Sequence, residues 1–139
     1  MNLEPSNQTK LFNHNKIFNF FTKLNSQNNL PNKILLSGEK GIGKCTLAYH
    51  LINYILSIDE EYPYDLNNFQ IINENKSFRL ILNKSNPNFD LIDVSEEKKR
   101  IDIKQIRDLI IKLNKSSFNE KPRFVLIDNI EYLNKNSVN

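Results

Sequence analysis

The first part of the chain alternates between helical and strand-like patterns of apolar residues. Residues 14–24 are predicted to form an amphipathic helix because apolar side chains recur there with helical spacing. Its predicted core-facing stripe is Ile17, Phe20, Phe21 and Leu24. The short apolar run 33–37 ends at a glycine and predicts a buried strand. Residues 45–57 then carry apolar side chains on one face and predict a second helix. That face consists of Leu47, Leu51 and Ile55.

The second part of the chain repeats this alternation after a polar stretch. Residues 59–75 are acidic and then polar, which predicts a loop with little regular structure, as for the polar N-terminus up to about Lys10. A short helix is expected over 76–83 and a turn at 86–88. Two apolar runs, 89–94 and 123–128, predict strands.

A further helix lies between the last two predicted strands, after a charged loop at 95–100. Asp102 stands three residues before Gln105, as in a capping box. The apolar stripe that follows is Ile103, Ile106, Ile110 and Leu113. Lys112 and Lys115 suit the negative C-terminal end of this helix. Residues 134–139 predict the start of another helix.

Strands that alternate with helices predict an α/β fold, with a mainly parallel sheet covered by helices on both faces. Three strands are fewer than an α/β ATPase core requires. We therefore expect residues 1–139 to be the N-terminal part of such a domain, truncated at its C-terminus, with an unfinished sheet edge.

All three glycines of the 139-residue chain lie within six residues and give it its clearest motif. Residues 38–44 match GxxxxGK, the phosphate-binding loop of P-loop NTPases, placed between a predicted strand and a predicted helix. Glycines let the backbone turn its N–H groups toward a phosphate, and the lysine reaches the β- and γ-phosphates. Asp128 ends a buried strand, as the Mg²⁺-orienting Asp of a Walker B strand does. The predicted nucleotide-binding residues are Gly38, Glu39, Lys40, Gly41, Ile42, Gly43, Lys44, Cys45, Thr46 and Asp128.

Two positions depart from the pattern of a hydrolysing ATPase. The residue after the lysine should be Ser or Thr, whose hydroxyl binds Mg²⁺, but Cys45 stands there and Thr46 comes one residue late. Asn129 follows Asp128 where hydrolysing AAA+ enzymes have Glu, and an amide cannot activate water. Glu131 has no clear reason to replace that base. We expect ATP to bind weakly at most, with Mg²⁺ poorly held and no catalytic residue.

Composition limits the remaining functions. A net charge of +3 does not indicate a dedicated nucleic-acid surface, and the densest basic cluster, 98–100, is interpreted as a solvated loop. The single cysteine excludes an internal disulfide and favours a reducing cytoplasm. No apolar stretch approaches the length that spans a membrane. The only histidines are His14 and His50, without a zinc-type Cys/His cluster, so no zinc is expected.

Several segments resemble the bacterial DNA polymerase III clamp-loader delta-prime subunit. These are residues 11–14, 30–31, 36–38, 41–49, 103–107, 124–128 and 134–139. The resemblance covers nearly the whole chain, with 59–85 poorly matched. It implies an AAA+ module in a five-subunit machine that places a sliding clamp on primed DNA. Delta-prime-like subunits often have altered Mg²⁺ and catalytic positions and act as a rigid scaffold, which Cys45 and Asn129 fit.

The resemblance also implies partners for this chain, and two alternative functions remain beside it. It implies the other clamp-loader subunits as direct partners, with the clamp and DNA reached through the complex. The finger, sensor, lid and collar residues would lie beyond Asn139. One alternative is a catalytically active clamp-loader ATPase of the gamma/tau type. Another is a different P-loop nucleotide-binding protein.

Overall fold

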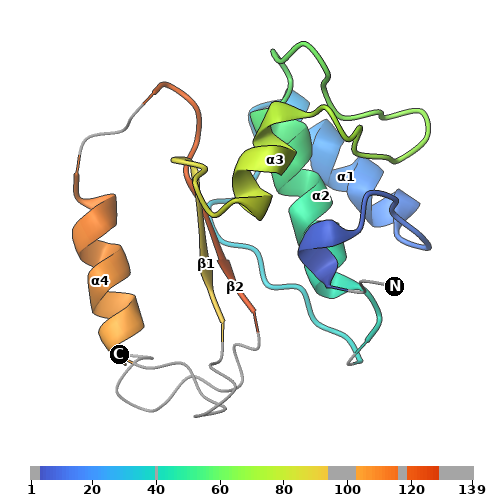
Figure 1. Cartoon of the computed structure of the whole chain (residues 1–139). Coiled ribbons are helices and arrows are strands. Elements are labelled where there is room, and N and C mark those ends of the chain that lie inside the picture. Colours follow the sequence, from blue (N-terminus) through green and yellow to red (C-terminus); the bar gives the residue numbers. More distant parts are fainter. Residues whose placement is uncertain (1–3, 40, 94–102, 116–118, 129–139) are drawn as a thin grey trace. The chain divides into compact units, whose positions relative to one another are not determined.

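The computed structural model describes residues 4–39, 41–93, 103–115 and 119–128. Its contacts divide the chain into two compact units, Met1–Ser85 and Asn86–Asn139, which are described here one at a time. The first unit contains helices only, and the second contains two strands and a helix, within the part of the chain that the structure describes (Figure 1).

In the first unit, helix α2 (Lys44–Leu56) contacts both α1 (Asn15–Ser26) and α3 (Lys76–Leu82), and the short 3₁₀ helix η1 (Pro5–Asn7) packs on α2 and α3 (Figure 1). The predicted stripe of α2 is confirmed, because Leu47, Leu51 and Ile55 are buried. Burial extends further round α2 than predicted and includes two polar residues, His50 and Asn53.

The predicted core face of α1 is partly wrong. Phe18, which lies outside the predicted stripe, is completely buried, whereas Ile17 and Phe20 are about half exposed. The Phe18 ring lies 5.1 Å from the ring of Tyr64 and 5.9 Å from that of Phe69. Helical periodicity predicted one apolar face, but packing against these aromatic rings turns Phe18 toward the core instead of Ile17 and Phe20.

The loop 59–75 has more structure than its polar composition predicted. It forms antiparallel bridges in which Gln70 pairs with both Asp65 and Lys10. The N–H of Ile71 donates to the carbonyl of Thr9 over 2.7 Å. The N-terminal segment, expected to be loose, is therefore paired with this loop through backbone hydrogen bonds that composition does not reveal.

Buried amides connect the same loop to α2. The side chain of Asn75 caps α3 by accepting from the N–H of Phe78 over 2.9 Å. Asn53 and Asn75 also exchange side-chain hydrogen bonds of 2.9 and 3.2 Å. Both residues are almost fully buried, and reciprocal bonding satisfies their amide groups without water.

The predicted strand 33–37 is not a strand in the structure. No ladder is assigned to it, and Leu35 is 75% exposed. A strand forms only where another strand accepts its hydrogen bonds, and the described part of its own unit contains none.

In the second unit, strands β1 (Phe89–Ile92) and β2 (Phe124–Ile127) pair in parallel, with Phe89 opposite Phe124 (Figure 1). Helix α4 (Ile103–Leu113) connects the two strands in sequence and contacts β1. The predicted α/β class and the parallel pairing are confirmed, whereas the sheet has two described strands instead of three.

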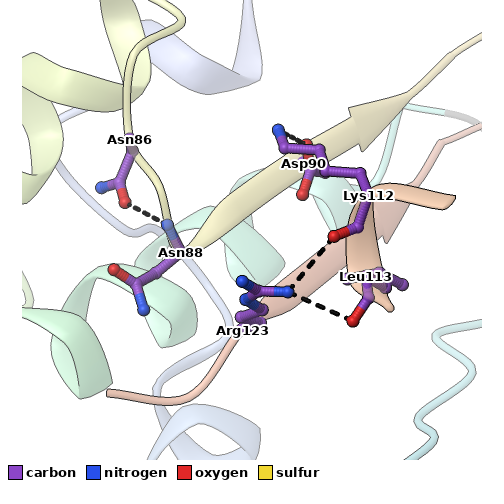
Figure 2. A network of polar contacts seen from close by, with 6 residues as sticks. All are labelled: Asn86, Asn88, Asp90, Lys112, Leu113 and Arg123. Carbon is purple, nitrogen blue, oxygen red and sulfur yellow. Dashed lines mark hydrogen bonds and ion pairs between the residues drawn. The ribbon is translucent and has the colours of Figure 1, made fainter. Parts of the chain in front are cut away.

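Polar contacts fix the ends of these elements (Figure 2). Asn88, in the predicted turn before β1, is buried and donates to the carbonyls of Lys121 and Pro122. Arg123 donates to the carbonyls of Lys112 and Leu113 at the C-terminal end of α4 over 3.5 and 3.3 Å. It also donates to the carbonyl of Lys115 over 3.2 Å. The predicted role of a cation at this helix end is thus taken by the arginine that immediately precedes β2.

Lys112, predicted for the same role, instead pairs with Asp90 of β1 at 2.5 Å (Figure 2). The predicted stripe of α4 packs only in part, because Ile110 is 52% exposed. The charged loop 95–100, the capping residue Asp102 and the predicted helix 134–139 lie outside the described residues.

Candidate functional site

The glycine loop immediately precedes α2, as predicted, whereas the strand predicted before the loop does not form. Gly41 and Gly43 have φ angles of 86° and 93°, in the left-handed region that side-chain-bearing residues rarely adopt. Gly43 is the N-cap of α2, and its carbonyl accepts the first helical hydrogen bond from the N–H of Leu47 at 3.0 Å. The N–H groups of the first turn and the positive end of the helix dipole are suited to an anion.

Lys44, the first residue of α2, folds back over the loop. Its Nζ donates to the carbonyl of Gly38 over 2.7 Å, which joins the two ends of the motif. Glu39 and Gly41 are exposed, so the loop between these ends faces solvent. The lysine would have to exchange this carbonyl for a phosphate oxygen on binding. Lys40, also predicted for the site, lies outside the described residues.

His14 contacts the loop from the other side. This residue is the N-cap of α1, and its Nε2 lies 2.5 Å from the carbonyl oxygen of Ile42. A Cβ atom added at Gly43 would lie 3.2 Å from the same nitrogen. Sequence reasoning considered His14 only as a zinc ligand and as part of the 11–14 segment. Its place in that segment was the only available signal for this contact.

Position 45, where the motif predicts a Mg²⁺-binding hydroxyl, is a cysteine at the start of α2. Cys45 and Thr46 lie in the first turn of α2 and are half-buried. Successive helical residues are rotated by about 100° around the axis, so Thr46 cannot present its hydroxyl where Cys45 presents its thiol. A thiol is a poor ligand for Mg²⁺, which prefers oxygen. The residues of the loop fit a phosphate group, whereas position 45 does not fit the metal.

Asp128 belongs to the second unit, where it directly follows β2. Its N–H donates to the carbonyl of Ile92 over 2.9 Å, which extends the parallel pairing by one residue. The predicted approach of Asp128 to the glycine loop would join residues of different units and stays a prediction. Asn129 and Glu131 lie outside the described residues.

The second histidine is a structural residue of the core. His50 is completely buried, its Nε2 donates to the carbonyl of Gln8 over 2.8 Å, and its Nδ1 accepts from the hydroxyl of Tyr64 over 2.7 Å. Burial lowers the pKa of His50 to about 4, against which the bond to Gln8 acts only in part. The pKa of Tyr64 is raised, mainly by burial and to a smaller extent by the negative charge of Asp65.

Among the described residues, no group of three or more His, Cys, Asp or Glu side chains is placed to hold a metal ion. The described helices also include none that is long and apolar enough to cross a membrane.

The fold and the candidate site thus define the class of this protein, an α/β protein with a glycine loop at the start of a helix. Residues 13–139 match the sequence model of the family described as DNA polymerase III, delta subunit. The chain belongs to this family of clamp-loader-type subunits. Members form part of the DNA polymerase III clamp-loader complex, so other subunits of that complex are their partners. No curated protein matches the chain.

Proposed function

We propose that this chain is a delta-prime-type subunit of the clamp loader. In this proposal it is an AAA+ P-loop module that acts as a scaffold and has little or no ATPase activity of its own. The observation that carries the proposal is Cys45, a thiol in the first turn of α2 at the position of the Mg²⁺-binding hydroxyl. Asn129, in place of the water-activating Glu, supports the same conclusion.

The proposed nucleotide interaction is weak binding of ATP at the glycine loop. The left-handed glycines and Lys44 support binding of the phosphates, as does the exposed position of the loop. From its position after an apolar strand, as in a Walker B sequence, Asp128 is proposed as a Mg²⁺-orienting residue. When bound, ATP would bring the negative charge of its phosphates, which Mg²⁺ would partly neutralise. In this proposal Asn129 leaves the site without a residue that activates water.

The proposed partners follow from membership of the clamp-loader family. The chain would assemble with the other subunits of a hetero-pentamer and reach the sliding clamp and primed DNA through that complex. A scaffold role in bacterial replication also implies a cytoplasmic location.

Hydrolysis gives the direct test of this proposal. Loss of the general base alone lowers rates on the order of 10²–10⁴-fold, and the altered metal position adds to that loss. We expect the steady-state ATPase activity of the purified chain to equal that of a Lys44→Ala variant. Both would be measured alone and with the other subunits, the clamp and primed DNA of the same organism.

The alternative is an active ATPase of the gamma/tau type, which the retained glycine loop and Lys44 favour. Turnover by the wild-type chain that is abolished by Lys44→Ala would establish this alternative and reject the scaffold role. To assign turnover in the complex to this chain, the variant would be reconstituted with wild-type partners.

A further inference from the structure

We propose that His14 is a positioning residue for the glycine loop, which holds the Ile42–Gly43 peptide so that the Gly43 N–H faces a bound phosphate. This inference rests on the proposed nucleotide site. The His14 ring touches the peptide in two ways. Its Nε2 lies 2.5 Å from the Ile42 carbonyl oxygen, and it occupies the space beside the Gly43 Cα. Because a carbonyl oxygen can only accept, Nε2 carries the proton of this bond.

The orientation of one peptide group then determines the orientation of a phosphate donor. None of the described peptide bonds is cis, so the Ile42 carbonyl and the Gly43 N–H point in opposite directions. A side chain that holds the carbonyl on one side of the loop therefore presents the N–H on the other. This N–H belongs to the residue before Lys44, at the start of α2, where the motif binds phosphate.

His14 is itself firmly held. As the N-cap of α1, it accepts from the N–H of Phe18 at its carbonyl over 2.9 Å. Phe18 is completely buried and lies in the aromatic cluster with Tyr64 and Phe69. The preceding residue, Asn13, has a φ of 65°, which turns the chain sharply before the helix. The backbone of His14 is thus held at the start of a helix that packs into the core, and its imidazole connects this backbone to the loop.

The chain is well suited to a test by NMR because it has only three glycines, whose amide signals can be followed individually. ATP would be titrated into the ¹⁵N-labelled full chain, with and without Mg²⁺. The variants are His14→Phe, which keeps a ring but has no donor, His14→Gln, which restores an N–H donor, and Lys44→Ala as the binding-deficient control.

We expect the Gly43 amide of the wild type to shift on addition of ATP. His14→Phe should weaken ATP binding by about threefold to tenfold, the value of one hydrogen bond. His14→Gln should recover most of that loss, and the effect of His14→Phe should be equal with Mg²⁺ and with EDTA. A purely structural role would instead lower the thermal stability of both variants without this rescue.

Three outcomes would overturn the inference. One is a folded His14→Phe protein with unchanged affinity, and another is a folded His14→Gln protein as weak as His14→Phe. The third needs no variant, namely a wild-type Gly43 amide that does not respond to ATP. None of these would reject the scaffold role, which requires no nucleotide. Conversely, ATPase activity would reject the scaffold role and leave the positioning role of His14 intact.

Discussion

At the scale of single residues, position 45 determines how well the proposed site binds Mg²⁺. Replacing Cys45 by Thr would restore a hydroxyl to the first turn of α2, and Mg²⁺ prefers such oxygen ligands. We expect Cys45→Thr to bind ATP about tenfold more tightly in the presence of Mg²⁺, or about 1.4 kcal/mol. Isothermal titration calorimetry of both proteins would measure this difference.

The same titration in EDTA is the matched control for position 45. Without Mg²⁺ the new hydroxyl has no metal to bind, so the two proteins should have equal affinities. If Cys45→Thr gains nothing in Mg²⁺, the assignment of position 45 to the metal is wrong.

His50 makes the stability of the first unit depend on pH. Its pKa is lowered from 6.5 to about 4 in the folded chain, so on acidification the unfolded chain takes up a proton first. The resulting contribution to stability is complete above pH 6.5, decreases as the pH falls and is lost once the pH passes below about 4. The full loss is at most about 3 kcal/mol. Urea unfolding of wild type and His50→Gln between pH 7.5 and 4 would measure it.

Carboxylates titrate in the same range, so the difference between the two proteins is the relevant quantity. We expect the wild type to lose more stability than His50→Gln between pH 6.5 and 4. Equal pH dependence in both proteins would show that His50 does not remain neutral in the folded state.

At the scale of secondary structure elements, Asn75 connects the start of α3 to the buried face of α2. Its side chain accepts from the N–H of Phe78 and exchanges hydrogen bonds with Asn53. Asn75→Ala would remove the cap and leave the buried Asn53 amide unsatisfied. We expect a loss of about 2–4 kcal/mol in the free energy of unfolding, measured by denaturant titration.

The neighbouring Asn73 provides a matched control, because its side chain is exposed and its carbonyl, which accepts from Arg79, remains in Asn73→Ala. That variant should change the free energy of unfolding by less than about 0.5 kcal/mol. A similar loss in both variants would contradict the assigned role of Asn75.

At the scale of the whole molecule, the two units differ in how much apolar surface they bury. Of the fully buried apolar residues in the described part of the chain, only Ile92 belongs to the second unit. Local opening is easier where few apolar contacts are lost. We therefore expect amide hydrogens of α2 to exchange with deuterium much more slowly than those of α4, as measured by mass spectrometry. Equal protection of the two helices would show that α4 packs more tightly than its exposure indicates.

The sequence alone determined the elements whose signals are local. The glycine loop was expected to use the left-handed backbone that glycine allows, and Gly41 and Gly43 adopt it. The stripe of α2 has one clear helical face and was predicted correctly. The parallel pairing of β1 with β2 followed from their separation by a helix. The family resemblance likewise depended on short contiguous segments, and the match over residues 13–139 confirmed it.

Contacts between residues distant in sequence were decided by the tertiary structure. Phe18, which lies outside the predicted stripe of α1, is buried because Tyr64 and Phe69 of the loop 59–75 pack against it. The run 33–37 is largely apolar, yet no strand within the described residues pairs with it. His14 meets Ile42 across 28 positions of sequence. Periodicity and composition describe one segment at a time, whereas pairing and burial depend on which segment lies opposite, and only the folded chain determines that.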